Sequence, residues 1–147
     1  MRAVVSRVSE SRVRVDGDTV GQIGRGLLVY VGVIAGDTAS DVAWMARKLT
    51  TLRIFDEAEP GKMNESVADV GGGLLLISNF TLSARTKKGT RSSFTDAAEP
   101  AEAERLFDRV AEACRAVVPT ETGRFGASMR IENVADGPVT IWLDSRA

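Results

Sequence analysis

Two hydroxyl side chains, Ser78 and Thr81, stand where a run of apolar residues passes into a long polar segment. Functional residues gather at such junctions because a rigid element positions them. The sequence contains no histidine and one cysteine, which excludes Ser-His-Asp triads, Cys-His pairs, His-ligated metals, intrachain disulfides and iron–sulfur clusters. Catalysis here must use hydroxyls, carboxylates, lysine or arginine, backbone groups or the substrate itself. Alternatively, both hydroxyls only satisfy backbone groups at a strand end.

The densest basic cluster lies in the same polar segment and consists of Arg85, Lys87, Lys88 and Arg91, with Phe94 close behind. A basic segment beside an aromatic ring can hold phosphates and stack on a base. The chain has 19 basic and 20 acidic residues and a net charge of −1, so nucleic acid would be bound by this local patch and not by overall charge. An ordinary solvated loop is the alternative.

Other features of the sequence have structural interpretations. Cys114 falls on the apolar face of an expected helix and is interpreted as an inert core thiol. The glycine run at 71–73 precedes a strand, whereas phosphate-binding loops precede a helix, so it is interpreted as a turn. Gly137-Pro138 lies between two expected strands, where the X-Pro bond can be cis at low cost, with a simple connecting turn as the alternative.

Hydrophobic periodicity predicts the elements that carry these residues. The expected strands lie at the N-terminus and near 13–15, 19–23, 27–34, 74–77, 128–134 and 139–143. A first helix begins at Thr38, which forms a capping box with Asp41. A second helix begins at Pro100, buries a stripe extending to Val117, and ends before proline 119. Residues 55–61 are interpreted as an exposed loop.

The order of these elements predicts the fold class. Regular β-α-β alternation is missing, so a doubly wound parallel sheet is not expected. We expect an α+β fold with one domain over residues 1–147, in which two main helices pack on a curled, barrel-like mixed sheet. The sequence lacks a run of about 18 apolar residues, and its charged N-terminus does not resemble a signal peptide. We therefore expect a cytoplasmic protein without a membrane partner.

Several segments form a collinear set along the chain. They are M-R-A-V-V-S-R-V-S at 1–9, L-R-I-F at 52–55, G-K-M-N at 61–64, S-N-F-T-L at 78–82, K-G-T-R-S-S-F-T-D-A-A at 88–98, G-R-F-G-A-S-M at 123–129 and G-P-V-T-I-W-L at 137–143. Together they resemble the D-aminoacyl-tRNA deacylase (D-tyrosyl-tRNA deacylase) family. A single motif of this kind is weak, but the set is specific and covers nearly the whole chain.

The resemblance implies a pocket for the aminoacyl end of a tRNA that carries a D-amino acid. The residues implied as catalytic are Ser78, Phe80 and Thr81. Those implied as substrate-binding are Asn79, Ala98, Phe125 and Met129, with Ala98 near the substrate amino group. No cofactor and no metal are implied.

The resemblance also implies a homodimer whose subunits complete each other's pockets. Gly137 and Pro138 would form a Gly-cisPro motif that enters the partner's pocket and rejects L-amino acids sterically. Arg7 would support that loop. The basic cluster and Phe94 would bind tRNA, and DNA is not an expected partner.

The implied reaction is hydrolysis of the ester between a D-amino acid and the terminal ribose, with glycine misattached to tRNA-Ala as a further substrate. The ester is already activated, so positioning water and stabilising an oxyanion supply the needed several kcal/mol. A neighbouring ribose hydroxyl would position the water, and backbone N–H groups near Phe80 and Thr81 would hold the carbonyl. A direct Thr81 nucleophile is the alternative, although no residue is evident to deprotonate it.

The chain departs from the family pattern at several positions. The family usually has Gln where this chain has Ser6 and Asn79. It usually has Pro where this chain has Ser92, and Asn where this chain has Ala135. Two rivals stay open: a non-catalytic RNA- or metabolite-binding homodimer on the same fold, and a hydrolase of free D-amino-acid esters that needs no tRNA.

Overall fold

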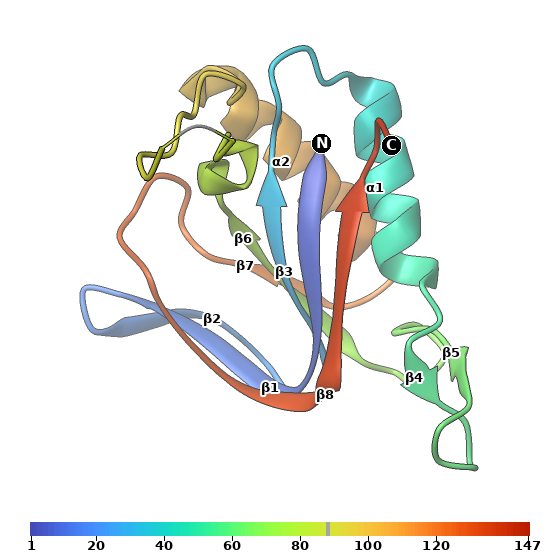
Figure 1. Ribbon diagram of the computed structural model, residues 1–147. Helices are drawn as coiled ribbons and strands as arrows, with labels where there is room; N and C mark the ends of the chain where they lie inside the picture. Colours follow the sequence, from blue (N-terminus) through green and yellow to red (C-terminus); the bar gives the residue numbers. More distant parts are fainter. Residues whose placement is uncertain (88) are drawn as a thin grey trace.

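The computed structural model describes residues 1–87 and 89–147, in which two α-helices pack on a strongly bent mixed sheet (Figure 1). The helices are α1 (Ala39–Thr51) and α2 (Pro100–Arg115), with a short 3-10 helix, η1 (Phe80–Ser83). The strands are β1 (Arg2–Val15), β2 (Asp18–Ile23), β3 (Gly26–Gly32), β4 (Phe55–Asp56), β5 (Met63–Glu65), β6 (Gly73–Ser78), β7 (Thr120–Thr122) and β8 (Arg130–Asp144). This architecture confirms the expected α+β class.

The sheet is built around β1, which pairs antiparallel with β2, β3 and β8. The first half of β1 pairs with β3, the second half pairs with β2, and β8 follows β1 along both halves. The remaining pairs, β3 with β6 and β6 with β7, are parallel. Because β1 and β8 bend together midway, the sheet curls toward a nearly closed barrel (Figure 1).

The single strand β8 covers the region in which the sequence predicts two strands, 128–134 and 139–143. β8 is continuous through Gly137 and Pro138, but its register on β1 shifts between the pairs Ser6–Thr140 and Val8–Ala135. Residues 136–139 therefore bulge out opposite Arg7 without ending the strand. A bulge accepts proline, which has no N–H to give to the ladder. The Gly137–Pro138 peptide bond is cis.

Other sequence-based expectations were wrong at the margins of the core. Within the segment expected as an exposed loop at 55–61, residues 57–61 are an exposed loop, but Phe55 and Asp56 form β4 of the small β4–β5 hairpin. The three-residue strand β7 was not expected. Such short strands form through pairing with a partner and have little signal of their own. Val117 is 58% exposed, because α2 ends at Arg115 and the chain leaves the helical phase.

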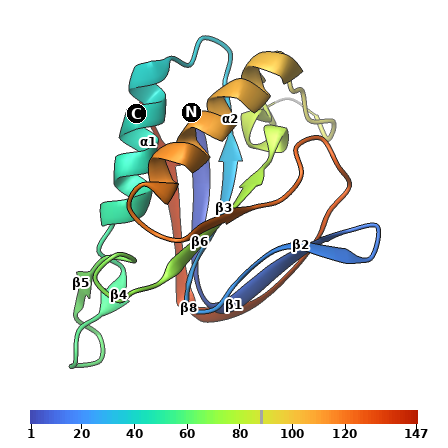
Figure 2. The same ribbon diagram turned by 180° about the vertical axis from the view of Figure 1, so that it is seen from behind.

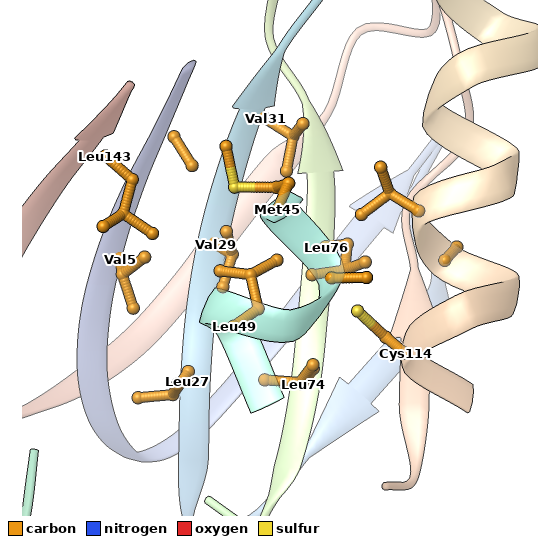
Figure 3. Packing of buried hydrophobic residues seen from close by; sticks show 14 of the residues in the cluster. Val5, Leu27, Val29, Val31, Met45, Leu49, Leu74, Leu76, Cys114 and Leu143 are labelled. Atoms are coloured by element: carbon orange, nitrogen blue, oxygen red, sulfur yellow. The ribbon is translucent and has the colours of Figure 1, made fainter. Parts of the chain in front are cut away.

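Both helices cover one face of the sheet and enclose the main core (Figure 2). The helices and the sheet contribute the core side chains seen in Figure 3, among them Val29, Met45, Leu49, Leu76 and Leu143. The predicted capping box of Thr38 and Asp41 is present at the start of α1. Cys114 is fully buried, which confirms its place in the core, and this burial raises the pKa of the thiol to about 12.

Candidate active site

A mainly apolar pocket of about 720 Å³, called the main pocket below, opens at the carboxyl ends of the parallel strands β3 and β6. Ligands commonly bind beyond the carboxyl ends of parallel strands. The structure brings together at this pocket the following residues expected from the sequence: Ser78, Asn79, Phe80, Phe94, Ala98, Phe125 and Met129.

The entrance to η1 fixes the backbone beside the main pocket. The N–H of Asn79 donates to the carbonyl of Val31, which ties the segment to the end of β3 (2.8 Å). The side-chain Oδ1 of Asn79 caps η1 by accepting hydrogen bonds from the N–H and the hydroxyl of Thr81, at 3.2 and 2.6 Å. Thr81 itself is exposed and lies just outside the pocket lining. The cap therefore sets the conformation of Phe80 and Thr81.

The rim of the main pocket carries an exposed aromatic pair. The rings of Phe80 and Phe94 meet edge to face, with centroids 5.2 Å apart and an interplanar angle of 72°. Phe80 is 61% exposed, so its ring presents a large apolar surface to solvent. Aromatic faces of this kind can stack on a nucleobase.

The wall of the main pocket that precedes α2 is fastened to the residues that follow β3. The N–H of Ala98 donates to the carbonyl of Val33 (3.1 Å), and the N–H of Ala35 donates to the carbonyl of Asp96 (2.8 Å). These bonds hold the segment before α2 against the pocket and place Ala98 in its lining.

Tyr30 is a lining residue that sequence reasoning missed. It lies in the apolar strand run that was expected to be buried on both faces, yet it is half-buried, and burial raises its pKa. A tyrosine within an otherwise aliphatic strand was the signal available in the sequence.

The Gly137-Pro138 loop and Arg7 lie away from the main pocket of their own chain. Arg7 is buried, and its guanidinium donates to the carbonyl of Asp136 (3.0 Å) and to that of Ile54 (2.7 Å). The arginine thus fixes the loop, whose residues Gly137 and Pro138 are exposed.

The described basic residues of the cluster, Arg85, Lys87 and Arg91, lie outside the lining of the main pocket. Arg85 forms a two-bond ion pair with Asp96, and this hydrogen bonding raises the pKa of Arg85. Lys87 and Arg91 are exposed, while Lys88 lies outside the described residues.

Within residues 1–87 and 89–147, His, Cys, Asp and Glu side chains form no group of three that could hold a metal ion. None of the helices in the described part of the chain is long and apolar enough to cross a membrane.

Comparison with known proteins decides the family. Residues 4–144 match the family model described as D-Tyr-tRNA(Tyr) deacylase. The chain belongs to the D-aminoacyl-tRNA deacylase family. A D-aminoacyl-tRNA deacylase from Vibrio cholerae is 50% identical over 99% of this chain and 100% of its own length. One from Geobacter sulfurreducens is 52% identical, covering 100% of this chain and 97% of its own.

Solved structures agree with the deacylase fold. A protein described as a c-Myc DNA Unwinding Element Binding Protein aligns with a TM-score of 0.95 and 35% identity over 100% of both chains. A probable eukaryotic D-amino acid tRNA deacylase has the same fold, with a TM-score of 0.81 and 18% identity over 97% of both chains. As a member of the deacylase family, the chain is a hydrolase that acts on ester bonds.

Proposed function

We propose that this protein hydrolyses the ester bond of D-aminoacyl-tRNA and releases the free D-amino acid and tRNA, and that glycine misattached to tRNA-Ala is a second substrate. The observation that carries the proposal is the gathering of the expected substrate residues in the main pocket, beside the capped entrance to η1. Because its substrate is used in translation, we place the enzyme in the cytoplasm. It needs no cofactor or metal in this scheme, and DNA is not a proposed partner.

The backbone at the start of η1 provides the oxyanion donor. The N–H of Thr81 is already bound to Asn79, whereas the N–H of Phe80 makes no hydrogen bond to the residues that the structure describes. Phe80 lines the main pocket, so its N–H is available to the ester carbonyl as negative charge develops. A fixed donor stabilises that charge without reorganising during the reaction.

The hydroxyl of Thr81 acts by positioning. It donates to the amide oxygen of Asn79, and an amide is not a base that could remove its proton. Its oxygen can still accept a hydrogen bond from the attacking water or the ribose hydroxyl. The ribose hydroxyl adjacent to the ester then assists the attack, and Ser78 supports the same strand end.

Changing Thr81 to Ala separates positioning from nucleophilic catalysis. Loss of one hydrogen bond is worth about 1 kcal/mol, so we expect kcat to fall by up to about ten-fold in Thr81→Ala. Thr81→Ser keeps the hydroxyl and should remain close to the wild-type rate. Single-turnover hydrolysis of D-Tyr-tRNA measures both. Complete loss in Thr81→Ala, with a trapped acyl-enzyme in the wild type, would establish the nucleophile and reject positioning.

Rejection of L-amino acids is assigned to a second copy of the chain. Gly137 and Pro138 are exposed and outside the lining of their own main pocket, and Arg7 holds the residue that precedes them, so they can serve a pocket in a partner subunit. Among the described strands, β8 pairs only with β1, so its other edge is open. Val134 and Trp142 on β8 are exposed apolar residues suited to an interface. Loop carbonyls in the partner's pocket would leave no space for an L side chain.

The acceptor end of tRNA is assigned to the rim of the main pocket. The exposed pair of Phe80 and Phe94 offers a stacking surface, and Lys87 and Arg91 lie in the adjoining loop as exposed cations. Phosphate contacts of this kind give a binding constant that falls with added salt.

One assay distinguishes the proposed function from its rivals. The purified protein is incubated with D-Tyr-tRNA, L-Tyr-tRNA, glycyl-tRNA-Ala and D-Tyr ethyl ester, and release of the amino acid is followed. We expect release from D-Tyr-tRNA and glycyl-tRNA-Ala alone. Release from the ethyl ester at the tRNA rate would identify a free-ester hydrolase, and no release with tight RNA binding would identify a binding protein. Sedimentation of the same preparation should show a dimer, and a monomer that still discriminates by handedness would overturn the shared pocket.

A further inference from the structure

Three arginines from distant parts of the chain meet in a second, polar hollow of about 260 Å³. Arg2 comes from β1, Arg85 from the loop after η1, and Arg146 from the segment after β8. This hollow, called the arginine hollow below, is completed by the following residues: Ile34, Ala35, Asp96 and Asp144.

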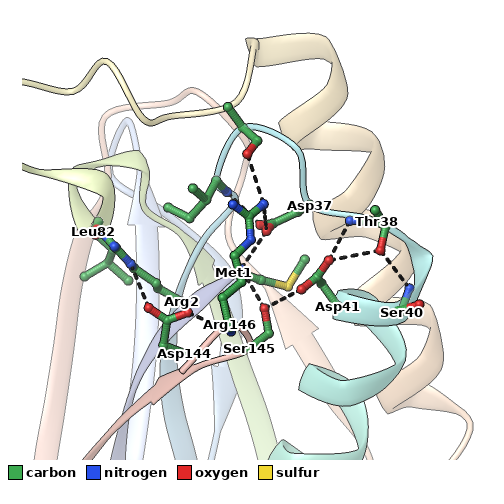
Figure 4. A network of polar contacts seen from close by, with 12 residues as sticks. Met1, Arg2, Asp37, Thr38, Ser40, Asp41, Leu82, Asp144, Ser145 and Arg146 are labelled. Carbon is green, nitrogen blue, oxygen red and sulfur yellow. Dashed lines mark hydrogen bonds and ion pairs between the residues drawn. The ribbon is translucent and has the colours of Figure 1, made fainter.

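The arginine hollow adjoins the main pocket through shared backbone. Asp96 lies in the hollow, and the next residue, Ala97, lines the main pocket. On the side of η1, Arg2 Nη1 donates to the carbonyl of Leu82 at 3.0 Å (Figure 4). A ligand that extends out of the main pocket past η1 therefore meets these arginines within a short distance.

The arginine hollow has more positive than negative charge. Arg2 pairs with Asp144 at 3.1 Å, and Arg85 pairs with Asp96. Arg146 pairs with Asp37 at 2.7 Å, but Asp37 lies buried beneath the hollow and also binds the buried ammonium group of Met1 at 2.7 Å (Figure 4). The lining of the hollow thus presents three guanidinium groups and two carboxylates, and the guanidinium of Arg146, 44% exposed, has its counter-charge buried beneath the hollow.

The chemistry of the arginine hollow favours a phosphodiester. A guanidinium has five N–H donors, and the bonds made by Arg2 and Arg146 within the described residues occupy only some of them. Guanidinium forks match phosphate oxygens, and the single negative charge of a phosphodiester complements a lining with three guanidinium groups and two carboxylates. We propose that Arg2 and Arg146, with Arg85, bind the phosphodiester on the 5′ side of the terminal nucleotide of the substrate tRNA. This inference rests on the proposed function.

Two stable probes test the proposal directly. Both carry D-tyrosine in an amide link to 3′-amino-3′-deoxyadenosine, which resists hydrolysis, and they differ in having either a free 5′-hydroxyl or a 5′-methyl phosphodiester. Calorimetry gives the dissociation constants for the wild type, Arg2→Gln and Arg146→Gln. Arg109→Gln, on the exposed side of α2, is the matched control. We expect each hollow variant to bind the phosphodiester probe about ten-fold more weakly, and the hydroxyl probe as the wild type does.

The variants have different side effects, which keeps the test decisive. Arg2→Gln releases a contact with η1 but spares the Asp37 pair, whereas Arg146→Gln does the reverse. Unchanged binding of both probes, or equal weakening of both, would overturn the phosphate site. Failure of the wild type to bind either probe would overturn the proposed function itself, together with this inference. With full-length tRNA, each variant should also reduce the slope of log affinity against log salt by about one.

Discussion

Gly32→Ala is expected to lower kcat/KM for D-Tyr-tRNA by about 100-fold, because a displacement of about 1 Å in an active site has that effect. Gly32 ends β3 directly beneath η1, and an added Cβ would lie 2.8 Å from Leu82 Cβ and 3.0 Å from the carbonyl oxygen of Asn79. Neither neighbour is the far end of a flexible side chain. The alanine must therefore displace η1 and the Asn79 backbone, and with them the Phe80 N–H.

The matched control for this change is Gly24→Ala, since a Cβ at Gly24 would meet no atom within 4 Å. Steady-state hydrolysis and thermal melting of both variants separate a displaced η1 from a loss of fold. A Gly32→Ala enzyme with the wild-type kcat/KM would show that the position of η1 does not limit the reaction.

The sequence was sufficient to predict the elements with a strong local signal. The apolar runs of β3 and β6 are predicted because both faces of these strands are buried, and the start of α1 because Thr38 and Asp41 cap it by contacts three residues apart. Short strands such as β7 carry no such signal, because pairing with β6 creates them.

The sequence predicted the location of the candidate site and some of its residues. The strand-to-loop junction at Ser78 indicated where the main pocket would lie, and the family resemblance supplied further lining residues, among them Asn79, Ala98, Phe125 and Met129, but not Tyr30. The resemblance also placed Arg7 at the Gly137-Pro138 loop, where its guanidinium donates to the carbonyl of Asp136. The meeting of Arg2 with Arg146 was not predictable, because it joins opposite ends of the chain and depends on the bend of the sheet.

The buried acid beneath the arginine hollow should be the most important single polar group for stability. Asp37 accepts hydrogen bonds of 2.7 Å from the ammonium of Met1 and the guanidinium of Arg146 (Figure 4). It accepts a third, also of 2.7 Å, from the N–H of Ile34. Its side chain is fully buried, so water cannot replace it as a partner. The carboxylate joins the beginning and the end of the chain to the loop before α1.

Asp37→Asn is therefore expected to lower the free energy of unfolding by about 3–5 kcal/mol, because removing one partner of a buried pair leaves an uncompensated charge. The neutral amide cannot balance the ammonium of Met1, and Arg146 loses its counter-charge at the same time. Urea denaturation measures the loss as a lower midpoint with an unchanged slope. Asp108→Asn, on the exposed face of α2, should stay within about 0.5 kcal/mol of the wild type. If Asp37→Asn lost as little as this control, the ion pairs of Asp37 with the ammonium of Met1 and the guanidinium of Arg146 would contribute no net stability.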